Sequence, residues 1–474
     1  MLNKSRGAAA FLVGCLLVLL AAPQAATGAA AGSFSPTGSM GTKRWVPGAA
    51  SIPGGVLVAG GANEVGNPVS SAEVYDPATG TFSPTGSMGT LRQGPAAAPL
   101  PGGRVLVAGG FIGPSTFLDS AEVYDPATGT FSPTGSMGTE RYKAAAAPLP
   151  DGRILVAGGR NDDPPFTNLS SAEVFDPFTN SFSPTGSMGT ARHAPAAAPL
   201  PDGRVLVAGG IAADNTTVLP TAEVYDPATG TFSPAGSMGV GRSFFAAAPL
   251  TGGDVLVAGG NNAPSLSSAE VYDLATGTFT SAGVGSMGGG RYGPAAAPLP
   301  DGRVLVAGGN TGPGGPDSFL DTAEIFTPDT FQPDALIRLR QGEPKGGDVY
   351  NEDGSGQVRS TKARPGQKKT FRITVENDGN VPDSYTVSGR GRSSKKWGVK
   401  YSFGGLNVTS AVRDGTFDFK AADFDPGEER ELRLIVKPKD GAKAGARKSV
   451  LVTVVSKGDG TKDAVRARVR VKKA

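Results

Sequence analysis

The sequence predicts an all-β protein: a six-bladed β-propeller followed by an antiparallel β-sandwich. A unit of about 50 residues occurs six times, the repetition ends near residue 331, and the rest of the chain alternates apolar and polar residues in short runs between turns. We therefore expect a signal peptide at 1–31, a propeller at 32–331 and a sandwich at 332–474.

The first 31 residues have the composition of an export signal. Two basic residues precede the apolar run 8–22, and an Ala-rich stretch follows. This order is typical of secretory signal peptides, so we expect a secreted or cell-surface protein. Cys15, the single cysteine, lies in the apolar run and would be removed with the signal. The alternative is a lipobox at residues 12–15, Leu-Val-Gly-Cys, with Cys15 anchoring a lipoprotein.

Each repeated unit predicts four short strands. A small-residue run, Pro-Ala-Ala-Ala-Pro-Leu in several copies, is joined by an Asp-Gly or Gly-Gly turn to the apolar run Val-Leu-Val-Ala-Gly-Gly, which is a strong hairpin signal. The third strand, Ala-Glu-Val-Tyr-Asp, leads through Asp-Pro-Ala-Thr-Gly to the fourth. Because small side chains suit a crowded axis, we expect the Ala-rich strand to be innermost.

The propeller is expected to close through its N-terminal segment. Residues 33–40 repeat the fourth-strand text before the first complete unit, and the last unit ends in a degraded version at 330–333. We predict that residues 33–38 pair with the last blade around 304–326, which leaves only short, protected edges.

The repeated text resembles a known family. The Gly-Gly pair, the Tyr-Asp that follows it and the next aromatic residue, for example Tyr75-Asp76 and Phe82, are similar to the kelch repeat. All six copies match over about 33–331, with Phe where kelch repeats usually have Trp. The resemblance implies a kelch β-propeller of the secreted bacterial type.

Strand direction separates two faces of the predicted propeller. The near-identical Asp-Gly and Asp-Pro-Ala-Thr-Gly turns fall on one face, here called the turn face. The opposite, loop face carries the loops after the Gly-Gly pairs, which differ in length, charge and aromatic content: 62–71, 111–120, 160–171, 211–221, 261–268 and 310–322. We expect ligand specificity on the loop face.

Two rings of residues on the loop face are candidates for ligand binding. The residue after each unit's Arg varies: Trp45, Gln93, Tyr142, His193, Ser243 and Tyr292. The Arg itself is invariant, and Arg44, Arg141, Arg192 and Arg291 are candidates for an anion-binding ring. The alternative is that each Arg binds a carbonyl group or the Glu of the third strand. Six identical copies favour this structural role, since an asymmetric ligand rarely needs six identical contacts.

The composition excludes several chemistries. One Cys and one His allow no internal disulfide, no multi-Cys zinc site and no copper centre of the galactose-oxidase type. His193 alone is weak evidence for catalysis, and we expect no metal and no cofactor. Near-perfect repetition favours a non-catalytic binding or adhesion scaffold that recognises a protein or a carbohydrate.

An enzymatic alternative remains open. Kelch mutarotases of sialic acid use carboxylate and Arg groups, and Glu140 beside Arg141 is the only carboxylate in its slot among the six units. Glu140 is therefore a weak candidate for a catalytic base, although ordinary surface variation explains a single Glu equally well.

The C-terminal part is basic. Residues 332–474 contain 30 Lys and Arg against 18 Asp and Glu, a net charge of +12. Alternating runs predict strands at 370–376, 383–388, 397–403, 431–437, 449–455 and 464–471. The stretch 371–387 resembles immunoglobulin-like modules of secreted bacterial proteins.

Basic residues at 390–400 and 466–473 suggest two roles for this part. They are candidates to bind an anionic wall polymer, or they are solvated strand edges. Basic and aromatic residues are not interleaved here, so no specific nucleic acid partner is expected, and no membrane span is expected after the signal.

Overall fold

The computed structural model describes residues 31–472, except for 114–115, 163–165, 262–263, 313–317, 331–332, 340–356, 381–382, 392, 420–423 and 458–460. The predicted signal peptide, with Cys15, lies outside the described residues. The described part is built mainly of strands, with one α-helix, α1 (Thr409–Asp414), and one short 3-10 turn, η1 (Pro101–Gly103). It contains no helix long and apolar enough to cross a membrane.

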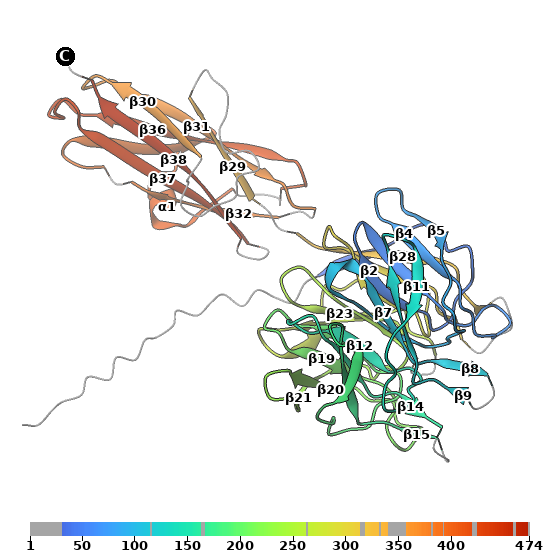
Figure 1. The fold of residues 1–474 in the computed structure, drawn as a ribbon. Helices are drawn as coiled ribbons and strands as arrows, with labels where there is room; N and C mark the ends of the chain where they lie inside the picture. Colours follow the sequence, from blue (N-terminus) through green and yellow to red (C-terminus); the bar gives the residue numbers. More distant parts are fainter. Residues whose placement is uncertain are drawn as a thin grey trace, which may run out of the picture.

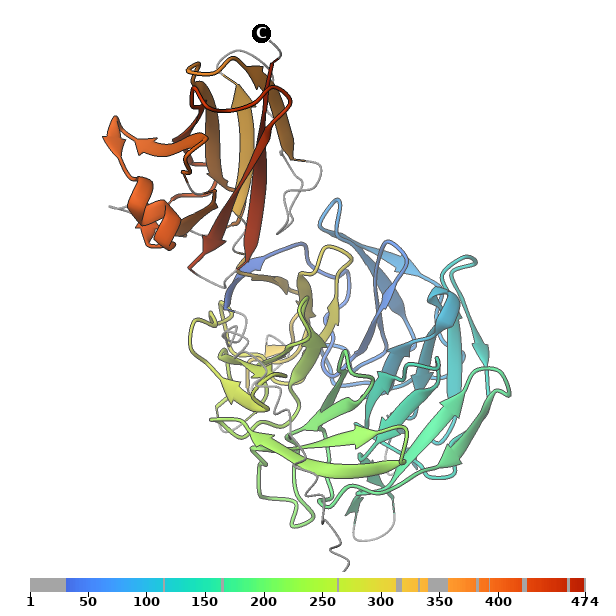
Figure 2. The ribbon, with the colours of Figure 1, turned by 90° about the vertical axis from the view of Figure 1, so that its left-hand side faces the viewer.

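Six four-stranded sheets, here called blades, lie side by side around an axis in the N-terminal part (Figures 1 and 2). Blade 1 is β2 (Gly48–Ile52), β3 (Gly55–Ala59), β4 (Ala72–Asp76) and β5 (Thr81–Thr85). Blade 2 is β6 (Ala96–Pro99), β7 (Val105–Ala108), β10 (Ala121–Asp125) and β11 (Thr130–Pro133), and blade 3 is β12 (Ala145–Pro148), β13 (Ile154–Ala157), β16 (Ala172–Asp176) and β17 (Ser181–Pro184). Blade 4 is β18 (Ala196–Pro199), β19 (Val205–Ala208), β20 (Thr221–Asp226) and β21 (Thr231–Ser237), and blade 5 is β22 (Ala246–Pro249), β23 (Val255–Ala258), β24 (Ala269–Asp273) and β25 (Thr278–Thr280).

The last blade closes the ring as predicted. It contains β26 (Ala295–Pro298), β27 (Val304–Ala307) and β28 (Ala323–Pro328), and its fourth strand is β1 (Gly32–Pro36) from the start of the domain. Phe34 lies opposite Phe326, with ring centroids 5.0 Å apart. A Cβ on Gly32 would lie 2.4 Å from the Phe326 ring, so the strand needs glycine there. The Ala-rich strands are innermost, and β26 contacts β2.

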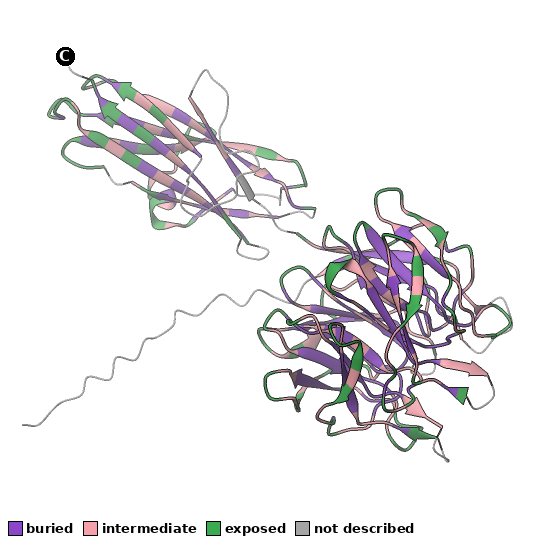
Figure 3. Cartoon of the chain, in the orientation of Figure 1, coloured by how far each residue is buried: buried purple, intermediate pink, exposed green. Residues whose placement is uncertain are grey.

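The core of the propeller lies between neighbouring blades. The second strand of each blade is buried on both sides, as Figure 3 shows in purple. One Met per unit fills the space between two blades and is no more than 4% exposed. Met88 packs against Gly60 of the preceding blade, where a Cβ would lie 3.1 Å from the Met Cε. In five of the six units the repeated Met and the first Gly of a Gly-Gly pair thus form one packing contact, whereas at Gly209 the near side chain is Phe245.

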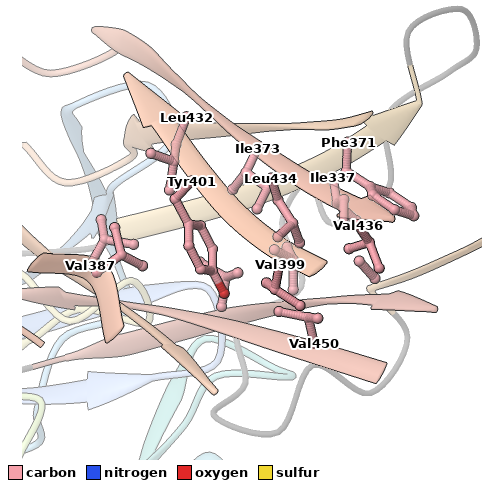
Figure 4. Packing of buried hydrophobic residues seen from close by; sticks show 14 of the residues in the cluster. Ile337, Phe371, Ile373, Val387, Val399, Tyr401, Leu432, Leu434, Val436 and Val450 are labelled. Carbon is pink, nitrogen blue, oxygen red and sulfur yellow. The ribbon is translucent and has the colours of Figure 1, made fainter. Parts of the chain in front are cut away.

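The C-terminal part is a sandwich of two five-stranded sheets. One sheet has the order β29 (Pro333–Leu339), β31 (Lys369–Asn377), β36 (Glu429–Pro438), β33 (Trp397–Phe403) and β34 (Leu406–Asn407). The other has the order β30 (Val358–Ala363), β38 (Lys462–Val471), β37 (Arg447–Ser456), β32 (Tyr385–Arg390) and β35 (Phe417–Asp418). Phe371, Tyr401 and Val450 belong to the continuous core between them (Figure 4).

The sandwich differs from the prediction in two ways. All six predicted runs are strands, but β29, β30 and the two-residue strands β34 and β35 were missed. Moreover, β30 pairs with β38 in parallel, where antiparallel pairing was expected. The two strands are separated by most of the domain, so no hairpin constrains their direction.

Candidate functional site on the loop face

The invariant arginines lie inside the blades. Arg44 precedes β2, and its guanidinium group reaches Glu73 on β4. Nε and Nη2 donate to Glu73 Oε1 at 3.3 and 3.1 Å, Nη1 donates to the carbonyl groups of Gly60 and Ser71 at 2.9 and 2.8 Å, and Nη2 also donates to Ser71 Oγ at 2.9 Å. These bonds use all five N–H groups of the side chain.

Glu73 extends this contact to the segment between two blades. Its Oε2 accepts a hydrogen bond from Gly41 N at 2.6 Å, and Oε1 accepts one from Thr42 N at 3.2 Å. Gly41 and Thr42 connect β1 to β2. The Arg–Glu pair therefore holds the linker and the blade together.

The Arg–Glu pair occurs in all six units, although Arg242 Nε has no hydrogen-bond partner in the described part of the chain. The Nη2–Oε1 distances lie between 2.9 and 3.2 Å, and each Arg is at most 4% exposed. Burial lowers the pKa of five of these guanidinium groups, and the paired Glu partly offsets the effect. The pairs are Arg44–Glu73, Arg92–Glu122, Arg141–Glu173, Arg192–Glu223, Arg242–Glu270 and Arg291–Glu324.

This geometry corrects the ligand-binding role predicted for four of the arginines. Their guanidinium groups are buried and already bonded within the blade, so they present no free N–H groups to a ligand. The structure contains the alternative arrangement, in which each Arg binds carbonyl groups and the Glu of the third strand. The corrected residues are Arg44, Arg141, Arg192 and Arg291.

A closed ring of backbone hydrogen bonds, here called the axial ring, lies next to the arginines. The residue two positions after each Arg has a left-handed backbone, with φ between 51° and 70°. Its N–H donates to the carbonyl group of its counterpart in the preceding unit at 2.8–3.1 Å, and the bond from Val46 N to Gly293 O closes the circle. Its members are Val46, Gly94, Lys143, Ala194, Phe244 and Gly293.

The axial ring lies at one end of the propeller axis, because its members directly precede the inner strands. Four of them are not glycine, and the left-handed region costs such residues about 1–2 kcal/mol each. The ring of hydrogen bonds holds this conformation in every unit. Each blade thereby presents the residue before the ring on the loop face.

The six variable residues take equivalent places beside the axial ring. Each forms an antiparallel bridge with the first residue of its own blade's loop, as Trp45 does with Ala62 and Tyr142 with Arg160. Trp45, Tyr142 and Tyr292 are partly exposed, whereas Gln93, His193 and Ser243 are buried.

Most of these residues join a continuous set of rings, here called the aromatic arc. Neighbouring ring centroids are 4.8–6.4 Å apart, within the range of favourable aromatic contacts. The arc begins at Phe166, which is 45% exposed, and ends beside Trp45. Its members are Phe166, Phe117, Phe111, Tyr142, His193, Phe244, Tyr292, Trp45 and Phe319.

The loop-face part of the arc was only partly predicted. The sequence predicted the four members that directly follow an invariant Arg: Trp45, Tyr142, His193 and Tyr292. Phe111, Phe117, Phe166 and Phe319 come from the loops after the Gly-Gly pairs, and Phe244 is in the axial ring. The aromatic content of those loops was the available signal.

The aromatic arc is electrically neutral near pH 7. Burial, with Arg160 and Lys143 nearby, lowers the pKa of His193 to about 3. Burial raises the pKa of Tyr292 to about 12 and also raises the pKa of Tyr142. Both His193 nitrogens and Trp45 Nε1 lack hydrogen-bond partners in the described part of the chain. The arc is therefore suited to contact and not to proton transfer.

Glu140, the weak catalytic candidate, is exposed on the segment between blades 2 and 3. Its neighbour Arg141 points into the blade toward Glu173, so the two candidate groups do not converge. Among the described residues, no three His, Cys, Asp or Glu side chains are placed to hold a metal ion.

Comparison with known proteins identifies the repeats. The family model for the Kelch motif matches residues 47–89, 94–138, 141–189, 192–239 and 242–283. The chain is a kelch-repeat β-propeller protein. A solved structure described as that of YjhT is similar to it, with 14% identity and a TM-score of 0.51 over 61% of this chain and 98% of that chain. At this identity the likeness shows the fold alone. No curated protein matches the chain.

The kelch protein carries a second candidate surface on its sandwich, here called the basic face. On the outer side of one sheet, Lys362, Arg470 and Arg447 lie opposite one another on β30, β38 and β37. In the neighbouring row, Arg468 lies between Ser360 and Ser449. These four basic side chains are exposed and line a groove of about 630 Å³.

Like charges in directly opposed positions disfavour a sheet by up to about 1 kcal/mol. In the described part of the chain, none of the four basic side chains has a carboxylate partner. The predicted basic segment 390–400 lies elsewhere, and its Lys395 and Lys396 are exposed. The described part of the other predicted segment, 466–472, contributes Arg468 and Arg470 to the basic face.

Proposed function

We propose that the kelch protein is an exported, non-catalytic binding protein whose loop face recognises a protein or carbohydrate ligand. The observation that carries this proposal is the aromatic arc. It joins residues from all six blades on the variable face, and partly exposed aromatic rings supply large contact areas at small entropic cost. The invariant Arg and Glu side chains, in contrast, bind one another inside the blades.

The test compares two exposed phenylalanines of the same unit on opposite faces. Phe166 ends the aromatic arc on the loop face, whereas Phe178, which is 80% exposed, lies in a turn on the turn face. We expect Phe166→Ser to weaken binding to the best ligands of a glycan array at least tenfold, and Phe178→Ser to leave it unchanged. Equal effects of the two changes would contradict a loop-face site.

If the full chain binds no glycan on the array, we expect the ligand to be a protein. The same pair of variants would then be compared in binding to surface proteins of intact cells. Loss with Phe178→Ser alone would place the site on the turn face.

We further propose that the basic face attaches the protein to an anionic polymer such as a wall polymer. Lys362, Arg470 and Arg447 lie in one row of this face, and their mutual repulsion lowers the stability of the sheet. An anionic ligand would offset this repulsion. We expect Arg468→Ser/Arg470→Ser to lower affinity for immobilised polyphosphate and to make the slope of log affinity against log salt concentration less steep by about 2. The matched control is Lys395→Ser/Lys396→Ser, which should retain the slope. The opposite result would place the site in the segment 390–400.

The alternative function is an extracellular carbohydrate-active enzyme similar to kelch sialic acid mutarotases. Its decisive variant is Glu140→Gln, with anomerisation of sialic acid followed by NMR. Catalysis by the wild-type chain that is lost in Glu140→Gln would replace the non-catalytic proposal. Equal rates for both chains would remove Glu140 from consideration.

A further inference from the structure

Two cations lie beside the aromatic arc, and both belong to blade 3. Three positions of each unit meet near the axis on the loop face: the variable residue after the Arg, the axial-ring member that follows it, and the first loop residue, which bridges to the variable residue. Among these positions in all six units, only Lys143 and Arg160 carry a charge. A chain of near-identical units thus departs from its symmetry at one place, and does so with positive charge.

Arg160 is held by two neutral amide groups. Its Nε donates to Asn168 Oδ1 at 2.9 Å, and its Nη2 donates to the side-chain carbonyl group of Asn215 in the loop of blade 4. Asn168 is 4% exposed, and its Nδ2 donates to Ala212 O at 2.6 Å, which fixes the direction of its Oδ1. The amides therefore orient the guanidinium group without neutralising its charge.

Neither cation has a carboxylate partner in the described part of the chain, where Arg160 Nη1 also has no hydrogen bond. Both side chains are half-buried. The Lys143 ammonium group lies 5.6 Å from the centroid of the Phe244 ring. Burial, together with the charges of Arg160 and Lys143, lowers the pKa of His193 to about 3. Both positive charges thus act on the middle of the aromatic arc.

This arrangement fits a carboxylate group. A guanidinium group binds a carboxylate through two parallel hydrogen bonds, and the Nη1 group of Arg160 is available for them. Because the amides already hold Arg160 in place, little further conformational freedom is lost when a ligand binds. A carboxylate would also relieve the repulsion between the two cations.

The length of the arc favours a protein segment as the source of this carboxylate. Seven consecutive rings lead from Phe166 to Trp45, with neighbouring centroids 4.8–5.8 Å apart. A sugar ring is about as large as one aromatic ring, whereas an extended peptide, which rises about 3.3 Å per residue, contacts several in succession. Trp45, Tyr142 and Tyr292 are partly exposed, and Trp, Tyr and Arg contribute most of the binding energy in protein interfaces.

From these observations we propose that the aromatic arc binds a protein segment that carries an acidic side chain. The carboxylate of this Asp or Glu forms an ion pair with Arg160, and Lys143 supplies a second positive charge. Neighbouring residues of the segment pack on the rings of Tyr142 and Tyr292. This inference rests on the loop-face site proposed above and narrows its ligand to an acidic protein segment.

The probe is a library of short random peptides displayed on phage and selected on the immobilised full chain. We expect Asp or Glu at one fixed position of the selected peptides. The best peptide is then synthesised with this residue and with its neutral amide, and fluorescence anisotropy measures both affinities. The neutral peptide should bind about tenfold more weakly. A library from which no peptide is selected, or selected peptides without an acidic position, would overturn the proposal.

Variants of the two cations locate the carboxylate. Arg160→Gln should weaken binding of the acidic peptide about tenfold and should bind the acidic and neutral peptides nearly alike. Lys143→Gln should reduce the same preference. The matched control is Arg153→Gln, which changes an exposed Arg in a turn of the same blade and should bind both peptides like the wild type.

Phe166→Ser separates this inference from the loop-face proposal on which it rests. If Phe166→Ser weakens peptide binding while Arg160→Gln keeps the preference for the acidic peptide, the loop-face site holds and the acidic ligand is wrong. If neither variant changes binding, the peptide binds elsewhere and both proposals fail. An acidic glycan whose binding is lost in Arg160→Gln, with no peptide selected, would assign the carboxylate to a carbohydrate and overturn the protein segment.

Discussion

Inside each kelch blade, a buried arginine is bonded to a glutamate and to backbone carbonyl groups, whereas in the sandwich the buried Tyr401 hydroxyl group has no hydrogen-bond partner among the described residues. On the outside the order is reversed: the sandwich has a row of like charges on the basic face. Removal of one of these arginines should therefore destabilise the propeller, whereas removal of the Tyr401 hydroxyl group should stabilise the sandwich. The comparison teaches that the same chemical groups serve folding in one domain and are available for binding in the other.

The largest expected effect is the loss of one Arg–Glu pair. Arg141→Met would leave Glu173 charged and buried without its partner, which costs about 3–5 kcal/mol. Urea denaturation followed by near-UV circular dichroism would measure the change. The control is Arg153→Met, which breaks an exposed ion pair with Asp151 and should cost less than about 1 kcal/mol. Similar costs for both variants would contradict the stabilising role of the buried pair.

His193 is a point where the propeller departs from this rule, because its buried nitrogens are unpaired. Its pKa is about 3 in the folded chain, below the ordinary value of 6.5, so the unfolded chain binds more protons between these values. The stability that His193 contributes is therefore lost as the pH falls from 6.5 toward 3. Relative to the wild type, His193→Gln should gain stability by about 1.4 kcal/mol per pH unit at most in this range. Gln93 occupies the same slot in another unit. Parallel pH profiles would contradict the burial argument.

Tyr401→Phe tests the sandwich core. The hydroxyl group lies beside Gly389, where a Cβ would be 2.2 Å from it, and burial raises the pKa of Tyr401. Removing an unpaired buried hydroxyl group should stabilise the sandwich by about 1 kcal/mol. Differential scanning calorimetry would show a higher melting temperature for that domain, and a lower one would mean that the hydroxyl group has a stabilising partner.

The smallest effect is expected at the basic face. Arg470→Thr removes the central charge of the three-cation row and should stabilise the sheet by about 0.2–1 kcal/mol. The same variant should bind polyphosphate less tightly. Stability and binding measured on one preparation would then move in opposite directions, and a variant that lost both would point to a structural role for Arg470.

Much of the propeller was predictable because each signal occurs six times. The turn residues, the Ala-rich inner strand, the closing pair of β1 and β28 and the Arg–Glu alternative all followed from repeated text. In the sandwich, β30 was missed because its exposed face is Ser and Lys and it has no hairpin partner. A parallel partner distant in the chain leaves no local pattern.

The loop-face site was less predictable. The axial ring has glycine in two units, but Val46, Lys143, Ala194 and Phe244 hide the need for a left-handed backbone in the others. Its ring of hydrogen bonds requires six segments to meet at the axis, which no single unit reveals. The aromatic arc likewise depends on how loops from different blades approach one another.

The pairing of β1 with β28 has a consequence for the order of folding. The first strand of the propeller to be synthesised has its partner in the last blade, so it has an unpaired edge until residues 323–328 are available. Five blades can form locally, but the ring is completed by one contact between the two ends of the domain. The slow, late step of folding should therefore be the docking of β1, and a circular permutant that joins it to β28 by a hairpin would bypass that step.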